Sequence, residues 1–394
     1  MQARTLREAK NSPQGLFFVH AQPPEGVQQS GNATFAGEHA PPQFAPGTGF
    51  RMKGFSWVRR SPRRVAVNLA LQGGGAHGAF TWGVLDRLLE SGRIDVAALS
   101  GTSAGAINAV VLAHGLAQGG LTGAREALDR FWTALGTQAP KGLTMGDGDG
   151  LRFTPMARWF MNMSQFVSPY DANPRGVNPL RDMLMQQVDF DRLRAADDVP
   201  VFVAATNANT GRLRLFSGQE LSLDAVLAST CLPAMHHAVE IDGEPYWDGG
   251  YSANPAVFPL LEANRARDTM LVLLSPLHHG TTPRSTAEIR ERAQDIAFDN
   301  TFLREMHMLA HVRALAAQSW LRGRFENRIM NAHFHLIEDS ENLGSLDGAT
   351  RLMAHSSFLE RLREDGRACA HAWLEQHAAT LGRSSSVDLQ ATFG

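Results

Sequence analysis

Between Arg64 and Ala113, apolar positions predict two buried strands that are each followed by a glycine-rich turn and a helix. Residues 65–71 form a nearly continuous apolar run that ends at glycine, as a parallel strand covered on both faces would. Residues 96–100 form a second run of this kind. After each turn, apolar residues recur at helical spacing. The chain is therefore expected to build its centre from strand, turn and helix in alternation.

The same patterns predict further elements downstream. Apolar runs indicate buried strands at 199–206 and 270–276 and an edge strand at 334–337. A two-residue Asp242-Gly243 turn between short alternating runs indicates a β-hairpin that ends near Asp248. Helical spacing of apolar residues predicts helices over 286–322, 358–362 and 368–381.

Composition divides the chain into three parts. Residues 1–62 are rich in Pro, Gly, Gln, Ala and Asn without a sustained period, so we expect a flexible tail. Residues 63–340 contain the predicted strands and form the expected catalytic domain. Residues 341–394 are expected to be a helical extension packed on that domain.

The stretch over residues 50–64 interleaves Phe50, Phe55 and Trp57 with arginines and a lysine. Aromatic rings beside cations suit a membrane interface, where the rings bury at headgroup depth and the cations attract anionic lipid. A solvated linker whose aromatics dock on the domain fits the same residues. Peripheral membrane contact is therefore one of two open interpretations.

Charge and cysteine content exclude several classes of protein. Lys and Arg number 37 against 39 Asp and Glu, so no bulk field favours nucleic acid. Two cysteines, Cys231 and Cys369, indicate neither a disulfide framework nor a metal cage. No run approaches the roughly 18 apolar residues of a spanning helix, and no signal sequence is visible. We expect a soluble, cytoplasmic protein that needs no cofactor or metal.

The first glycine turn, residues 72–78, can bind an anion. Without side chains in the way, its backbone N–H groups can converge on negative charge at the start of a helix. Gly73, Gly75 and Gly78 satisfy the dinucleotide pattern G-x-G-x-x-G, and Asp95 lies within the loose range for a ribose-binding acid. The turn alone leaves phosphate binding and acyl chemistry open.

The second turn, Gly101-Thr-Ser103-Ala-Gly105, has the G-x-S-x-G pattern of a nucleophile elbow in its strand–turn–helix context. Glycines at both flanks allow a tight turn, and the helix N-terminus favours an alkoxide-like oxygen on Ser103. A serine N-cap in an ordinary turn would have the same sequence. Together with the upstream glycine turn, the pattern favours a nucleophilic serine.

These motifs, with a distant Asp248-Gly249-Gly250, resemble those of the patatin-like phospholipases over residues 64–280. The segment from Ser229 to Pro233 is similar to another block of that family. The resemblance implies a three-layer αβα sandwich with a mostly parallel central sheet, and a Ser-Asp dyad acting on a lipid or fatty-acyl ester. The implied site comprises Ser103 as nucleophile, Asp248 as its partner, Gly73, Gly74, Gly75 and Gly78 as the oxyanion hole, and Gly101, Gly105, Gly249 and Gly250 as supports.

One position departs from the family pattern. His77 stands where these proteins often have Arg or Lys, so any help to the oxyanion would depend on pH. The resemblance leaves the head group, the acyl length and the oligomeric state open.

Several alternatives use the same residues. A Ser-Asp-His triad with His278, His279 or a later histidine fits the chain order, although the elbow follows only the second strand. His307 and His311 have the spacing of metal ligands on a helix but also of a solvated face. The dyad could transfer acyl groups to other acceptors, or the chain could bind nucleotide or membrane without catalysis. Met and aromatic residues over 153–166 suit either acyl contact or core packing.

Overall fold

The computed structural model describes residues 64–394, apart from 139–141, 147–150, 165, 197, 321 and the side chains of 160–164. The predicted flexible tail over residues 1–62 lies outside the described residues. So does the predicted membrane contact, except for Arg64, which pairs with Asp95 at 3.2 Å. The described residues belong to one compact unit, and the boundary between residues 340 and 341 stays a prediction.

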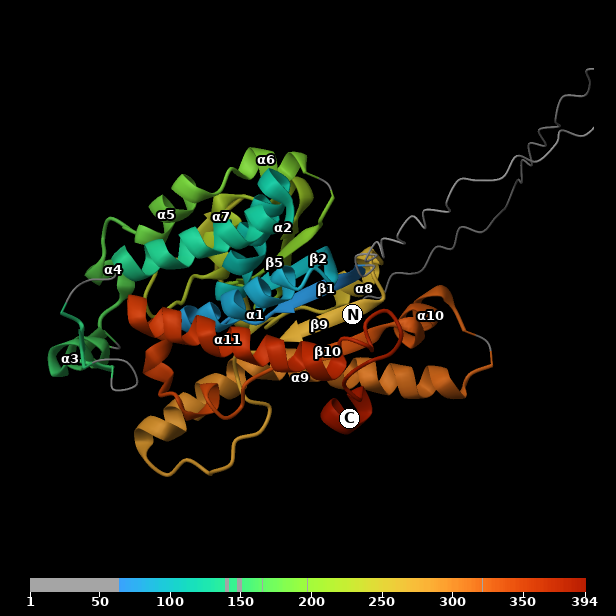
Figure 1. Cartoon of the computed structure of the whole chain (residues 1–394). Coiled ribbons are helices and arrows are strands. Elements are labelled where there is room, and N and C mark those ends of the chain that lie inside the picture. Colours follow the sequence, from blue (N-terminus) through green and yellow to red (C-terminus); the bar gives the residue numbers. More distant parts are fainter. Residues whose placement is uncertain (1–63, 139–141, 147–150, 165, 197, 321) are drawn as a thin grey trace, which may run out of the picture. The chain divides into compact units, whose positions relative to one another are not determined.

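The centre of the fold is a mixed, mostly parallel sheet (Figure 1) in the order β10-β9-β1-β2-β5-β8-β7, with β6 paired to β5. The parallel strands are β1 (Val65–Leu71), β2 (Ile94–Thr102), β5 (Val201–Asn207), β9 (Asp268–Val272) and β10 (His333–Ile337). The antiparallel strands are β6 (Leu213–Ser217), β7 (Val239–Ile241) and β8 (Glu244–Asp248).

Helices cover both faces of the sheet. One face packs on α1 (Gly78–Glu90), α2 (Ala104–Gln138), α7 (Leu223–Ser229) and α11 (Ser356–His377). The other packs on α8 (Phe258–Ala263), α9 (Thr286–Gln318), α10 (Arg324–Asn331) and α12 (Leu389–Phe393). The predicted three-layer αβα class is confirmed.

The remaining elements precede β5 or form short turns. They are the hairpin β3 (Thr144–Met145) and β4 (Arg152–Phe153), the helices α3 (Pro155–Ser164), α4 (Pro169–Ala172), α5 (Pro179–Gln187) and α6 (Phe190–Ala195), and 3-10 turns at Gly75–His77, Gly218–Glu220, Gly249–Tyr251, Leu343–Ser345 and Gly348–Leu352. Among the described residues, no helix combines the length and apolar character needed to cross a membrane.

Strand β1 shows why its sequence is apolar almost throughout. Leu69 and Leu71 face the α1–α2 layer, whereas Ala70 between them faces the α8–α9 layer. All three are fully buried. A strand with helices on both faces has no solvated side, so alternation with polar residues would bury unpaired polar groups.

The C-terminal helical prediction needs one correction. Instead of separate helices at 358–362 and 368–381, the structure has one continuous helix, α11, from Ser356 to His377. Gly366 does not break it, because this glycine lies where α11 crosses α1. A Cβ on Gly366 would clash with the Phe80 carbonyl oxygen, and one on Gly83 with the Arg363 carbonyl oxygen. The two helices therefore approach through glycine at both sides of the crossing.

The chain end closes the sheet at its predicted edge strand, β10. The Ser386 backbone N–H donates to the Phe334 carbonyl oxygen at 3.0 Å. The buried His335 side chain connects the Ser386 hydroxyl, 3.1 Å from Nδ1, to the Asp268 carboxylate, 2.9 Å from Nε2. These contacts cover an edge that would otherwise present unpaired backbone groups.

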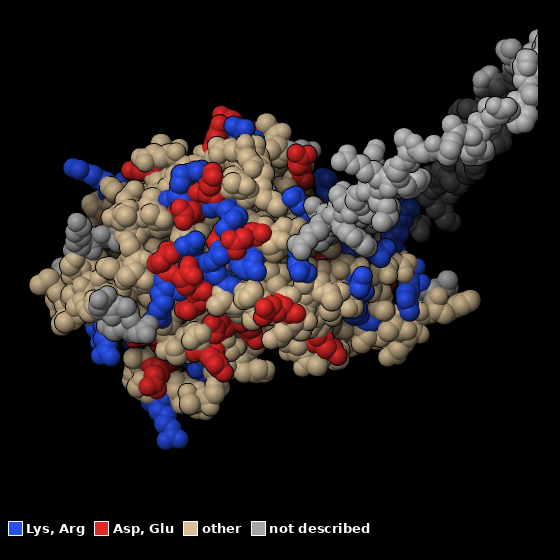
Figure 2. All heavy atoms as spheres, viewed as in Figure 1, with Lys and Arg blue, Asp and Glu red and all other residues tan. Residues whose placement is uncertain are grey.

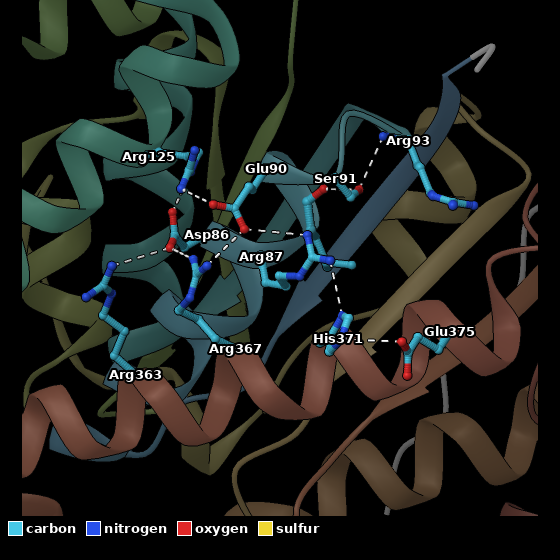
Figure 3. A network of polar contacts seen from close by, with 11 residues as sticks. Asp86, Arg87, Glu90, Ser91, Arg93, Arg125, Arg363, Arg367, His371 and Glu375 are labelled. Atoms are coloured by element: carbon cyan, nitrogen blue, oxygen red, sulfur yellow. Dashed lines mark hydrogen bonds and ion pairs between the residues drawn. The ribbon is translucent and has the colours of Figure 1, made fainter. Parts of the chain in front are cut away.

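Acidic and basic side chains alternate on the face over α1, α2 and α11 (Figure 2). Part of this face is a network centred on Asp86, which is 4% exposed (Figure 3). Its carboxylate pairs with Arg125 of α2 at 2.5 Å, with Arg363 of α11 at 3.5 Å, and with Arg367 of α11. One buried carboxylate on α1 thus joins three helices.

We predict that Asp86→Asn lowers the free energy of unfolding by about 2–3 kcal/mol, because it leaves three neighbouring guanidinium groups without their shared counter-charge. Urea unfolding monitored by circular dichroism measures the change. The matched control is Asp129→Asn on the exposed side of α2, which should change stability by less than about 0.5 kcal/mol. Equal losses in the two variants would contradict a special role for Asp86.

Candidate active site

Ser103 occupies a strained turn between β2 and α2. Its φ of 53° lies in the left-handed region, which a non-glycine residue adopts at a cost of order 1 kcal/mol or more. The flanking glycines make the turn sterically feasible. A Cβ on Gly101 would clash with the Gly105 carbonyl oxygen, and one on Gly105 with the Leu71 carbonyl oxygen. The predicted elbow geometry is therefore present.

A buried serine from another segment of the chain forms a hydrogen bond with this turn. The Ser103 backbone N–H donates to the Ser229 hydroxyl at 2.9 Å, and Ser229 is fully buried at the end of α7. The sequence indicated only that the segment from Ser229 to Pro233 resembles a family block. It did not show that this hydroxyl accepts a hydrogen bond from the backbone N–H of Ser103.

Strand β5 brings the predicted acid to the serine. Thr102, the last residue of β2, is paired with Ala204, and Asp248, the last residue of β8, is paired with Ala205. Because β6 occupies the opposite edge of β5, β2 and β8 lie on the same edge and meet end to end. Ser103 and Asp248 follow from this arrangement as neighbours, although 145 positions (248 − 103) separate them in sequence.

Asp248 is fully buried, and burial raises the pKa of its carboxyl to about 7. The Gly250 N–H, 2.8 Å from Oδ1, and the Ser103 hydroxyl oppose part of this increase. The contact with the serine lacks the geometry of a full hydrogen bond, and Oδ2 makes none with any described residue. Such loose contacts are common before substrate binds. A carboxyl with this pKa can accept a proton near neutral pH.

The glycine turn after β1 lies directly beside the serine. A Cβ on Gly73 would come within 2.7 Å of the Ser103 Cβ. The N–H of Gly73 is already bonded to the Asn254 side chain at 2.8 Å, and the N–H of Gly78 is bonded within its own turn. Of the four glycines predicted for the oxyanion hole, Gly74 and Gly75 therefore remain the better candidates to donate to substrate.

Two more glycines shape the segment after the acid. A Cβ on Gly249 would clash with the Ala204 carbonyl oxygen, and one on Gly250 with the Phe298 ring of α9. Both lie in the 3-10 turn Gly249–Tyr251, whose start is capped by the Asp248 carboxylate. The supports expected from the sequence thus lie where neighbouring strands and α9 leave no room for side chains.

His77 is placed differently from the expectation of a pH-dependent charge. Its ring is buried, its Nε2 lies 2.8 Å from the Thr350 hydroxyl, and it packs near Phe358. Burial, followed by the positive charges of Arg351 and Arg361, lowers the pKa of His77 to about 3. The ring is therefore neutral near pH 7 and offers no switchable cation to the glycine turn.

The competing interpretations lose support from the geometry. Asp95 pairs with Ala66 at the amino end of β1, whereas the glycine turn follows the carboxyl end, so Asp95 cannot reach a ribose bound there. Within the described part of the chain, no histidine forms a hydrogen bond with Asp248. His307 contacts the Phe393 carbonyl oxygen, and no group of metal ligands occurs among the described residues.

Comparison with known proteins identifies the family of this domain. Residues 69–263 match the family model described as Patatin-like phospholipase. Among solved structures, the chain is similar to "Crystal structure of VipD from Legionella pneumophila", with a TM-score of 0.36 and 16% identity over 80% of this chain and 68% of that one. No protein in the curated set matches. Residues 69–263 therefore form a domain of the patatin-like phospholipase family, whose broad activity is lipid acyl hydrolysis.

Proposed function

We propose that the chain hydrolyses fatty-acyl esters, namely phospholipids or lysophospholipids, with Ser103 as nucleophile and Asp248 as general base. The observation that carries this proposal is the meeting of β2 and β8 on one edge of β5, which places a strained serine beside a buried carboxyl. The family match supports the broad class of reaction.

In the first half-reaction, the Ser103 Oγ attacks the ester carbonyl carbon while its proton passes to the Asp248 carboxylate. The carbonyl oxygen becomes an oxyanion, for which the N–H groups of Gly74 and Gly75 are the proposed donors. Collapse of the tetrahedral intermediate breaks the bond to the alcohol, which takes the proton from Asp248. The acyl group remains on Ser103.

In the second half-reaction, water replaces the alcohol. The water oxygen attacks the acyl carbon while Asp248 accepts a proton from that water. The bond between the acyl carbon and Ser103 Oγ then breaks, and Asp248 returns the proton to Oγ. Oδ2 of Asp248 has no hydrogen bond to a described residue, so it is available to receive the proton in both steps. No histidine is required as a relay, because the carboxyl itself has a pKa near neutrality.

We predict that Ser103→Ala and Asp248→Asn each lower kcat/KM for a fatty-acyl ester by at least about 10³-fold. Mass spectrometry of lipid extracts incubated with each protein measures substrate loss. Fluorophosphonate should label Ser103 in the wild type and fail to label Ser103→Ala. Full turnover by Ser103→Ala would refute the nucleophile assignment.

Loss of activity in Asp248→Asn must be separated from unfolding. Burial raises the folded-state pKa of Asp248, so the folded state favours the neutral carboxyl. Stability from this group is therefore lost as pH rises from the usual carboxyl range to about 7. A neutral Asn avoids that cost, so the inactive variant should be at least as stable as the wild type at about pH 8.

The pH dependence of hydrolysis follows from the same carboxyl. Because Asp248 must be ionised to act as a base, kcat/KM should fall about tenfold per pH unit below its pKa of about 7 and level off above it. A rate profile with an uncharged ester between about pH 5 and about pH 9 tests this. A flat profile over that interval would exclude Asp248 as the base.

We predict that Gly73→Ala lowers turnover by at least about tenfold, because its methyl group would lie 2.7 Å from the Ser103 Cβ and displace the nucleophile. Initial rates on a soluble ester measure the effect. The control is Gly119→Ala at the kink of α2, where a Cβ meets nothing within 4 Å and φ is −152°. The glycine turn would have no close role if both variants kept full activity.

A further inference from the structure

Apolar side chains gather on the surface of α3, α4 and the chain next to them. Nine of the twenty large apolar side chains exposed in the described part of the chain lie between residues 143 and 185. We call six of them the α3–α4 surface: Met156, Trp159, Phe166, Val167, Tyr170 and Val177. Phe166 is 82% exposed and Met156 is 70% exposed. A concentration of this kind marks a surface that another phase or partner covers.

Cations accompany these apolar groups. Arg152, Arg158 and Arg175 are exposed within the same stretch, and none forms an ion pair with a described residue. Over residues 151–178, the narrower range that holds all six residues of the α3–α4 surface, Asp171 is the one acidic residue. On the face seen in Figure 2, the visible described atoms at the end that carries α3 and α4 are mostly uncharged, unlike those over α1 and α11. The α3–α4 surface therefore combines apolar area with a local excess of positive charge.

This combination fits an anionic bilayer better than a second copy of the chain. Trp and Tyr rings partition to headgroup depth, Met adapts to irregular acyl packing, and arginine attracts anionic headgroups. On α3, Ala157 is buried while Met156 and Trp159 face outward, as in a helix that lies in the interface plane. Two copies facing each other through this surface would oppose arginine with arginine.

The surface is also connected to Asp248, the proposed general base. The Tyr170 ring stacks on His237 at 4.1 Å between centroids, and His237 Nε2 lies 3.1 Å from the Pro169 carbonyl oxygen. The Cys231 thiol donates to the His237 carbonyl oxygen, and the Asp248 N–H donates to the Cys231 carbonyl oxygen at 2.8 Å. In Figure 1, α3 and α4 lie toward the end of the sheet to which the β9 arrow points.

We propose that the α3–α4 surface docks the protein on an anionic lipid bilayer, with Met156, Trp159, Phe166 and Tyr170 in the interface and Arg152, Arg158 and Arg175 on the headgroups. Docking would bring the carboxyl edge of the sheet, where Ser103 lies, against the membrane. The use of docking to deliver substrate rests on the proposed function, whereas the docking itself can be measured without catalysis.

The test is sedimentation of the full chain with vesicles of equal parts phosphatidylglycerol and phosphatidylcholine, and with phosphatidylcholine alone. All proteins carry Ser103→Ala so that lipid stays intact. The wild-type surface should bind the anionic vesicles, more weakly as salt increases. Replacing Arg152, Arg158 and Arg175 by Gln should lower the partition coefficient on the order of 100-fold. Trp159→Ser should lower it about tenfold.

The control variants change other exposed arginines and another exposed tryptophan, away from the α3–α4 surface. Arg93, Arg212 and Arg324 replaced together by Gln, and Trp320→Ser at 92% exposure, should leave binding within about twofold of the parent. Equal losses in the surface and control variants would overturn the proposal. Unchanged binding in both surface variants would also overturn it, because docking would then belong to another part of the chain. A change in the oligomeric state of the surface variants, measured by light scattering, would overturn it as well.

A soluble, monomeric ester separates the two proposals. With Ser103 intact, the surface variants should hydrolyse that ester at the wild-type rate and lose rate only on vesicles. Absence of any ester hydrolysis by the wild type would remove the proposed function while leaving the sedimentation result valid. Normal hydrolysis of the soluble ester without sedimentation on anionic vesicles would remove the docking proposal alone.

Discussion

The site depends on how one edge of β5 is shared. A strand edge offers one row of backbone donors and acceptors, and β2 uses the first part of that row while β8 uses the rest. The two strands approach from opposite directions, so their carboxyl ends meet. Hydrogen bonding of the backbone, which is obligatory in a buried sheet, thereby fixes the separation of Ser103 and Asp248. No side chain has to be long or flexible to close the distance.

Burial at this junction raises the pKa of Asp248, on which the proposed chemistry depends. A carboxylate in water has a pKa far below neutrality and is a poor base, but at full burial its charged form is destabilised. The Gly250 N–H and the Ser103 hydroxyl stabilise the charged form and so offset part of this increase in pKa. The resulting pKa of about 7 suits a base at neutral pH. The glycines around the junction serve the same end, because each side chain they lack would separate the strands or displace the serine.

The outer helices preserve this arrangement. Helix α11, near the end of the chain, crosses α1 through facing glycines and is held by the Asp86 network (Figure 3). The α1 helix begins at the glycine turn beside Ser103. Because α11 packs on α1, the C-terminal part of the chain helps to hold that turn in place. Helix α9 holds the glycine turn from the opposite layer. Its Asp299 carboxylate accepts a hydrogen bond at 2.9 Å from the side chain of Gln72, the residue directly before Gly73.

The sequence by itself determined the local elements and the types of residue at the site. The apolar run of β1, the elbow glycines around Ser103 and the Asp242-Gly243 turn each follow from local sterics and burial, so they were predictable residue by residue. The pairing of Ser103 with Asp248 came from family resemblance, because strand order is set by contacts distant in sequence. Only the tertiary structure decided that Gly73 N–H is bonded to Asn254, that Ser229 supports the elbow and that His77 is neutral. These two hydrogen bonds and the neutral state of His77 depend on contacts between segments that are distant in the sequence. Burial by such contacts leaves no local pattern of residues from which it could be predicted.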